Sequence, residues 1–190
     1  MVTQPAYLRA LRDYTKTKYG DDATTGTVAH FMTESDRGAL ILAATNIEDS
    51  LELQILERLP ALILDEAARK EMFEQDGAIS SFSRKTAMAY AMGIIDKPYR
   101  KLIDLIREVR NACAHSRQDI SLEVPELRKV CEVVIADMLP DMIDRSSKNV
   151  RAAFVSKCAF VAIYIATGQK IEGSEAQIRY HANLVDEQDG

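Results

Sequence analysis

The amino-acid sequence predicts an all-α fold, a bundle of about six to seven helices joined by short loops. Apolar residues recur at spacings of three and four along most of the chain, which is the period of an amphipathic helix. We find neither the apolar–polar alternation nor the hairpin turns that predict strands. A chain of 190 residues that is 47% apolar and 28% charged has the size and composition of one domain with one core.

The first predicted helix is short and lies near the N-terminus, where residues 7–14 place Tyr7, Leu8, Leu11 and Tyr14 on one face. The glycine- and aspartate-rich stretch 20–26 indicates a loop. The clearest helix runs from about Ser35 to Leu59, because hydroxyl and carboxyl side chains at 33–36 suit its start and Pro60 marks its end. Its inward stripe is Leu40, Ala44, Ile47, Leu51 and Ile55.

Five more helices are predicted further along the chain. A helical stretch near Leu62 to Phe73 leads to a turn at 75–77, and the next helix ends between Gly93 and Pro98. One helix begins at Pro98, another runs from Pro125 to Pro140, and the last extends from about Lys148 to Thr167 with Gly168 as its stop. Their predicted inward residues are Met88, Ala91, Met92 and Ile95; then Leu102, Leu105, Ile106, Val109 and Cys113; then Leu127, Val130, Val134 and Met138; and finally Val150, Ala153, Phe154, Val161 and Ile165.

These elements divide the chain into three parts. We expect an N-terminal helix and loop over residues 1–30, a helical domain over 31–168, and an acidic, loosely ordered tail over 169–190 that has few apolar anchors. No stretch approaches about 18 uninterrupted apolar residues, and the N-terminus lacks the basic and then apolar layout of a signal peptide. The sequence therefore predicts a cytoplasmic protein without a membrane partner.

The usual sequence marks of metal and cofactor sites do not occur. The three cysteines form no CxxC pair, and the three histidines (His30, His115 and His181) are far apart, so we expect reduced thiols and no metal site. Neither a P-loop nor a GxGxxG motif is present, so no nucleotide cofactor is predicted. A serine hydrolase is disfavoured by the lack of a GxSxG elbow, and Cys113 lies on an apolar face.

Charge is distributed unevenly along the chain. The net charge is −5, which argues against a protein whose whole surface binds nucleic acid. Between Arg84 and Arg117, however, eight basic residues face three acidic ones, a local balance of +5. This segment is either a solvated helical face or a surface for an anion, a phosphate backbone or an acidic partner.

The helix that begins at Pro98 carries the residues of greatest chemical interest. Arg107, Asn111 and His115 are spaced by four and form one stripe, and Arg110 lies within reach of Asn111. An imidazole can move a proton near neutral pH, and a guanidinium can stabilise charge on a phosphate. Such residues suit metal-free phosphodiester cleavage, with His115 as acid or base. The alternative is structural, with hydrogen bonds to neighbouring helices and a histidine at a helix C-terminus.

The segment Arg110-Asn-Ala-Cys-Ala-His115 resembles the motif of HEPN domains, helical bundles named for higher eukaryotes and prokaryotes nucleotide-binding. That motif is an arginine, a polar residue, three variable residues and a histidine, and Arg110, Asn111 and His115 fill the specified positions. The resemblance implies one of two functions. One is a metal-independent endoribonuclease of the toxin or defence kind, working as a dimer in which two motifs face each other. The other is a module without catalysis that binds partners or nucleotides.

Over a longer span, roughly residues 31 to 165, the chain resembles the mannitol operon repressor family. The matching stretches are Glu34-Ser-Asp-Arg-Gly-Ala39, then Gly77-Ala-Ile-Ser-Ser-Phe-Ser-Arg84 leading into Ala89-Tyr-Ala-Met-Gly-Ile-Ile95, and Leu105-Ile-Arg-Glu-Val-Arg-Asn-Ala-Cys-Ala-His115. Members regulate sugar-alcohol uptake operons, and their fold carries no recognisable DNA-reading helix. The resemblance therefore implies action through a protein partner. Cys113 departs from the pattern, since members commonly carry an aromatic residue there.

Five residues are candidate supports for the motif. Glu34, Asp36 and Arg37 open the long helix, where the carboxylates favour the helix dipole. Alternatively, one of the three pairs with the motif arginines across the bundle and orients Arg110 or completes a polar pocket. Arg84 stands beside the serines at 81 and 83, which suggests a helix cap with a cation next to it, and Arg107 extends the motif stripe.

Two functions follow from these observations. The first is a transcription regulator, a homodimer that acts through a protein or RNA partner without direct sequence-specific contact to DNA, since no helix-turn-helix, zinc finger or basic arm is present. The alternative is a metal-independent endoribonuclease that uses Arg110, Asn111 and His115 and leaves 2′,3′-cyclic phosphate ends. An enzyme needs His115 to be accessible, whereas a regulator tolerates a buried or salt-bridged pair.

Overall fold

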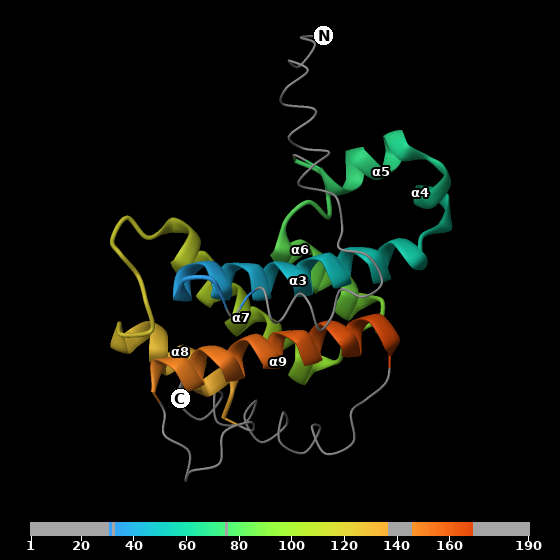
Figure 1. Cartoon of the computed structure of the whole chain (residues 1–190). Coiled ribbons are helices and arrows are strands. Elements are labelled where there is room, and N and C mark those ends of the chain that lie inside the picture. Colours follow the sequence, from blue (N-terminus) through green and yellow to red (C-terminus); the bar gives the residue numbers. More distant parts are fainter. Residues whose placement is uncertain (1–30, 32, 75, 137–145, 169–190) are drawn as a thin grey trace, which may run out of the picture.

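The computed structural model describes residues 31, 33–74, 76–136 and 146–168. Within these ranges the chain forms seven α-helices and no strand, which confirms the all-α prediction (Figure 1). The helices are α3 (Asp36–Glu57), α4 (Pro60–Leu64), α5 (Glu66–Phe73), α6 (Phe82–Ala91), α7 (Lys97–His115), α8 (Pro125–Val134) and α9 (Ser147–Thr167). The predicted N-terminal helix, the loop at 20–26, His30, His181 and the tail lie outside the described residues.

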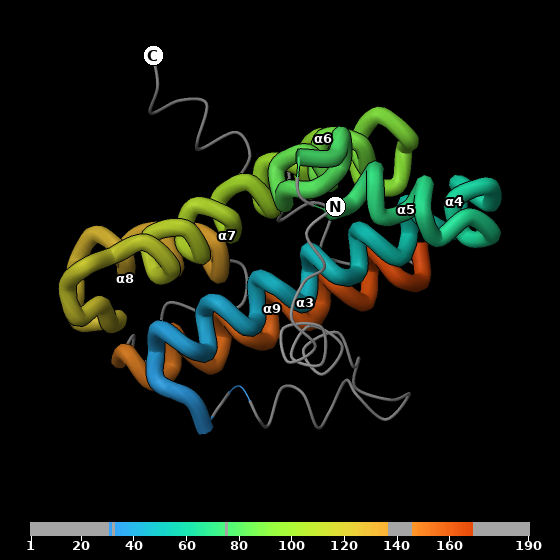
Figure 2. Tube along the Cα trace, turned by 90° about the horizontal axis from the view of Figure 1, so that it is seen from above, coloured from blue at the N-terminus to red at the C-terminus, as the bar shows by residue number. Residues whose placement is uncertain are grey.

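The bundle has two layers. Helices α3 and α9 lie side by side in one layer, and α6 and α7 pack against α3 from the other (Figures 1 and 2). The α3–α9 pair is parallel, because Arg151 of α9 contacts Asp36 near the start of α3, and Gln54 near the end of α3 donates to the main-chain carbonyl of Ala166. Helix α8 packs against α7 and α9, while α4 and α5 extend beyond the end of α3.

Helix α3 begins where the sequence predicts. Ser35 is its N-cap, with Oγ accepting a hydrogen bond from the backbone N–H of Gly38 at 3.1 Å, and the carboxylate of Asp36 lies in the first turn, where the helix dipole favours a negative charge. The predicted stripe of five apolar residues from Leu40 to Ile55 is fully buried and joins the core. The periodicity of this segment thus gave both the helix and its inward face.

The stretch predicted as one helix from Leu62 to Phe73 is two helices. Asp65 takes an extended conformation, and its side chain accepts from the backbone N–H of Ala68 at 3.0 Å, so it caps α5 and separates it from α4. Pro60, expected to stop the preceding helix, also opens α4, because a helix's first turn needs no N–H from that residue. No side chain of α4 is buried, and Leu64 is 89% exposed.

The inward face predicted for α6 is confirmed in part. Met88 and Met92 pack partly buried against the core and Ile95 is buried. Ala91 is exposed, and Ile95 lies beyond the helix, because the chain leaves the helix at Met92 and Gly93 adopts a φ of +70°. The predicted period was counted across this break. The buried residues of α6 are Phe82, Lys85, Thr86 and Ala89.

Helices α7, α8 and α9 largely follow the prediction. The five inward residues expected in α9 are buried, and Gly168 ends that helix in the left-handed conformation with a φ of +64°. In α7, Ile106, Val109 and Cys113 are buried, whereas Leu102 and Leu105 are half-buried. Helix α8 ends at Val134, and the predicted continuation through Met138 to Pro140 lies outside the described residues.

By length and composition alone, α9 could cross a membrane, although Arg151 and Lys157 interrupt it. Within the described chain it is the one helix with that property, and the sequence had indicated none. More than half of its most apolar stretch is buried in the bundle, as is typical of a core helix.

Candidate functional site

Helix α7 presents the sequence motif at its C-terminal end. The Asp96 side chain caps the start of the helix by accepting from the backbone N–H of Tyr99 at 3.0 Å, and Pro98 occupies the first turn. One face is buried through Ile103, Ile106, Val109 and Cys113. The opposite side therefore carries the polar residues of the motif, and His115 is the last residue of the helix.

Within the motif, Arg110 and Asn111 contact each other directly. Nη1 of Arg110 donates to Oδ1 of Asn111 at 3.4 Å, and Nε of Arg110 is buried without a hydrogen-bond partner among the described residues. No described carboxylate forms an ion pair with Arg110, and His115 is exposed at the helix end. The motif thus combines the exposed imidazole of His115 with the guanidinium of Arg110, whose charge no described carboxylate neutralises.

Arg107 lies on the same helix as the motif, one turn before Asn111, and contacts two carboxylates of that helix. Its Nη2 lies 3.6 Å from Oδ1 of Asp104 and 2.9 Å from Oε1 of Glu108. Two carboxylates on the same helix therefore balance its charge, and Arg107 is poorly placed to bind a further anion.

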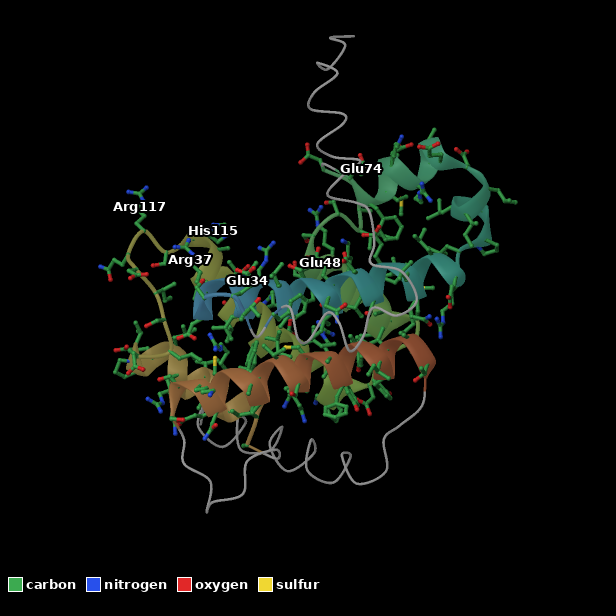
Figure 3. The ribbon with its side chains drawn as sticks, viewed as in Figure 1. Glu34, Arg37, Glu48, Glu74, His115 and Arg117 are labelled. Carbon is green, nitrogen blue, oxygen red and sulfur yellow. The ribbon has the colours of Figure 1, made fainter. Side chains whose placement is uncertain are left out.

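Arg37 reaches across the bundle to the end of α7. Its Nη2 donates to the main-chain carbonyl oxygens of Ala114 at 3.4 Å and Ser116 at 3.3 Å. The last carbonyls of a helix lack intrahelical donors and carry partial negative charge, so a guanidinium there satisfies and stabilises them. Arg37, His115 and Arg117 consequently lie at the same end of the bundle (Figure 3). This contact fixes the helix turn that carries His115.

Asp36 joins three separate parts of the chain. Oδ2 accepts from the backbone N–H of Leu122 at 3.0 Å, and Oδ1 lies 3.4 Å from Nη1 of Arg151. The same Nη1 donates to the main-chain carbonyl of Glu34 at 3.0 Å. The start of α3 is therefore hydrogen-bonded to the loop after α7 and contacts α9 through Arg151. The possibility that Asp36 pairs with the motif arginines is wrong, because its cationic partner is Arg151, a residue without a role in the sequence-based prediction.

Arg84 belongs to a separate cap at the start of α6. Oγ of Ser81 accepts from the backbone N–H of Arg84 at 3.4 Å, and Nη1 of Arg84 donates to the carbonyl of Gly77 at 3.0 Å. This confirms the predicted cap with a cation beside it. Among the described residues, no hydrogen bond or ion pair connects Arg84 with the motif.

A buried charge cluster lies between α6 and α3 and was not predicted from the sequence. Lys85 is 6% exposed, and its Nζ lies 3.0 Å from Oε1 of Glu48 and 2.8 Å from Oε2 of Glu52. Burial alone would lower the pKa of Lys85, but the hydrogen bonds and charges of Glu52 and Glu48 outweigh it, and the pKa is raised. A signal was present in the sequence, since the two glutamates are spaced by four on one side of α3.

The basic residues between Arg84 and Arg117 therefore do not form one continuous surface. Lys85 is buried, Arg107 is paired and Arg84 closes a loop. What remains near the motif is a compact cationic group at the end of α7. We call it the α7 corner and define it as Arg37, Arg110, Asn111, His115 and Arg117.

Cysteine chemistry is suppressed in this fold. All three thiols are buried and reduced, and burial raises the pKa of Cys113 to about 11 and that of Cys131 to about 12. Burial likewise raises the pKa of Cys158. Across the described ranges, no three His, Cys, Asp or Glu side chains gather closely enough to hold a metal ion.

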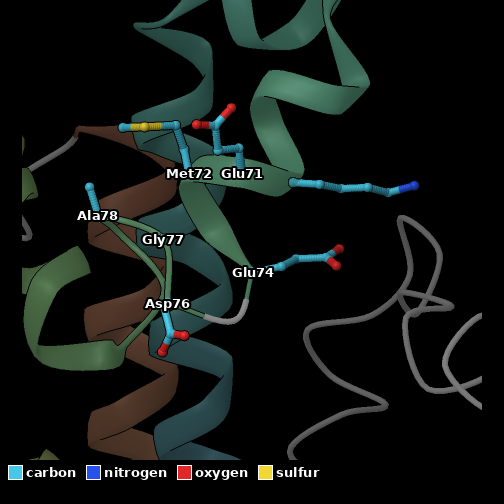
Figure 4. A pocket seen from close by; sticks show the side chains of 7 residues that line it. Glu71, Met72, Glu74, Asp76, Gly77 and Ala78 are labelled. Atoms are coloured by element: carbon cyan, nitrogen blue, oxygen red, sulfur yellow. The ribbon is translucent and has the colours of Figure 1, made fainter. Parts of the chain in front are cut away.

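A shallow depression lies near the end of α5, away from the α7 corner. Its lining includes Lys70, Met72 and the three carboxylates of Glu71, Glu74 and Asp76, and Figure 4 shows these side chains spread around the turn at Gly77. The acidic lining disfavours phosphate or nucleic acid as a ligand. We assign no function to this depression.

Comparison with known proteins supports the fold assignment. No protein-family model and no curated protein matches the chain. Among solved structures, it is similar to MtlR in the X-ray structure of the MtlR–HPr complex from Escherichia coli, with a TM-score of 0.59 and 17% sequence identity. The match covers 76% of this chain and 99% of the MtlR chain. At this identity the comparison shows a shared fold, and MtlR is a protein that was solved with a protein partner.

Proposed function

We propose that this chain is a transcription regulator that acts through a protein partner, and that the partner to test first is HPr. The observation that carries the proposal is the fold shared with MtlR, which extends over 99% of that chain and whose structure was solved as a complex with HPr. Fold alone does not determine function, so the α7 corner supplies the chemical argument.

The charges on the described surface favour a protein partner over base readout. Reading DNA directly needs an element that enters a groove and carries several free basic side chains. In the described part of α6 and α7, Lys85, Arg84 and Arg107 are occupied by other contacts. The other cations of α7 do not form one continuous stripe, because Lys97, Arg100 and Lys101 lie near its start and Arg110 lies near its end.

We place the partner-binding surface at the α7 corner. His115 and Arg117 are exposed, and neither has a hydrogen bond or an ion pair with another described side chain. Arg37 holds the underlying helix end through its two carbonyl contacts, so these groups stand on an ordered support. Exposed cations on such a support suit a carboxylate or phosphate group of a partner.

Titration calorimetry with purified HPr from the organism that encodes this chain tests the proposal. We expect saturable binding that Arg117→Glu weakens at least about tenfold, because rim charges of opposite sign become like charges. Lys97→Glu is the matched control, since it makes the same charge change about 27 Å away at the other end of α7. Absence of binding by the folded wild type, or equal loss in both variants, would contradict the proposal.

A specific observation also supports the ribonuclease alternative. His115 is exposed, while Arg110 contacts Asn111 and forms no ion pair with a described carboxylate. In this second proposal, which rests on the HEPN-like motif, His115 moves the proton and Arg110 stabilises charge on the phosphate, with no metal ion. The protein would work as a homodimer that brings two motifs together.

The ribonuclease test is cleavage of a mixed pool of labelled RNAs in EDTA. Activity of this kind would leave 2′,3′-cyclic phosphate ends and would disappear in both His115→Ala and Arg110→Ala, while Lys97→Ala would retain it. Intact RNA with well-folded wild-type protein would remove this alternative and leave the regulator. For either function we propose a cytoplasmic location and the division into residues 1–30, 31–168 and 169–190.

A further inference from the structure

Helix α9 is apolar around its whole circumference. Between residues 152 and 167 the one charged side chain is Lys157, and it is buried on the inner side. The inner side packs against α3 and α8, and Tyr164 stacks on Tyr99 of α7 with ring centroids 3.9 Å apart. A helix that is apolar all round is normally covered on every side.

The outer side of α9 is not covered by any described element. It carries the small side chains Ala152, Ser156 and Ala159, followed by Phe160, which is 46% exposed, and Ile163, which is 37% exposed. We call this stripe the outer α9 face. It offers bulky apolar groups next to small ones, with no charge along about three turns, and such a patch is typical of a surface that binds a partner or another segment.

We propose that the outer α9 face is the docking site for the N-terminal segment of the same chain, through a helix over residues 7–14. Tyr7, Leu8, Leu11 and Tyr14 follow the i, i+1, i+4, i+7 pattern of one apolar helix face, while Arg9 and Arg12 fall on its other sides. Large side chains on the docking helix would fit over the small residues of α9. This is helix-on-helix packing through two apolar stripes.

The position of the chain before α3 supports this occupant. Phe31 is buried at the start of the bundle, and α3 begins beside Arg151 near the start of α9. Residues 15–30 can span about 50 Å when extended, whereas Phe160 lies only about 14 Å along α9 from Arg151. A tethered segment has a high effective concentration at such a site, so it competes strongly with a second copy of the chain.

The chain contains no tryptophan, which makes a direct test possible. Full-length protein with Phe160→Trp carries a single reporter on the outer α9 face. We expect blue-shifted emission and weak quenching by acrylamide. Adding Leu8→Asp and Leu11→Asp should shift the emission to the red and raise the quenching constant several-fold, while circular dichroism should still show a folded helical bundle with a cooperative thermal transition.

Arg9→Ser with Arg12→Ser is the matched control, because it changes the net charge by the same amount on the solvent side of the proposed helix, and it should leave the emission shielded. Fully exposed emission in the parent variant would overturn the proposal. So would shielding that survives Leu8→Asp and Leu11→Asp. If the shielding instead increased with protein concentration, and sedimentation velocity showed a dimer over the same range, a second copy of the chain would be the occupant.

Discussion

Nη2 of Arg37, in the first turn of α3, lies 3.3 Å from the main-chain oxygen of Ser116, the residue that follows α7. The two residues are 79 positions apart in sequence, and the same guanidinium atom also donates to the carbonyl of Ala114. The end of α7 is therefore capped by a side chain from another helix. The placement of His115, between these two carbonyls, depends on α3.

Replacing Arg37 with methionine tests this cap. Arg37→Met keeps much of the aliphatic stem but removes both hydrogen bonds, and we expect it to lower the free energy of unfolding by about 1 to 2 kcal/mol. Urea denaturation measures this change. Arg117→Met is the control, because its side chain is exposed and lacks a described partner, and it should stay within about 0.5 kcal/mol of wild type. Equal effects of the two substitutions would argue against the cap.

The ion cluster of Lys85 should matter more for stability than any surface pair. Lys85→Met removes the cation between Glu48 and Glu52 and leaves two carboxylates close together in a largely buried place. We expect a loss of about 3 kcal/mol in unfolding free energy. Lys97→Met, at an exposed position, should change it by less than about 0.5 kcal/mol. A small loss for Lys85→Met would mean that the cluster is well hydrated.

The same cluster predicts a dependence of stability on alkaline pH. The pKa of Lys85 is raised in the folded protein above its ordinary value of 10.5, so folding favours the protonated form. This contribution is complete below the unfolded-state pKa and is lost as pH rises through the higher folded-state pKa. Unfolding free energies measured from pH 9 upward should therefore converge for wild type and Lys85→Met above pH 10.5. Parallel curves would contradict the raised pKa.

The cysteines should be inert while the protein is folded. With the pKa of Cys113 near 11 and that of Cys131 near 12, and with all three thiols buried, little thiolate exists at pH 8. A disulfide reagent should therefore modify none of them in native protein on a time scale of minutes, and should modify all three in denaturant. Rapid native reaction would show that the α7–α8–α9 interior opens locally.

Local sequence rules predicted best those features that depend on residues within a single helix. The stripe of α3 from Leu40 to Ile55, the Ser35 cap and the Gly168 stop depend on residues within a few positions of one another. The inward face of α6 was predicted only in part, because Gly93 changes the chain direction and the apolar residues on both sides of it still appear periodic. Ala91 is exposed, and Ile95 is buried beyond the end of the helix.

The contacts that shape the candidate site could not be derived in that way. Arg37 meets Ser116 and Asp36 meets Leu122 only after the helices have packed, and no spacing rule relates positions about 80 residues apart. Lys85 counts as one more surface cation in the sequence, yet it is buried because two glutamates of α3 face it. The motif itself, Arg110 with Asn111 and His115, lies within one helix and was found from sequence.

The parallel pairing of α3 with α9 has a consequence for synthesis of the protein. Asp36 and Arg151, which meet at the start of this pair, are separated by 115 residues. At about 5 to 20 residues per second, a ribosome needs roughly 6 to 23 s to supply the second partner after the first. During that interval α3 exposes the apolar side that α9 will later cover, so the nascent chain should be a chaperone substrate until its last described helix emerges.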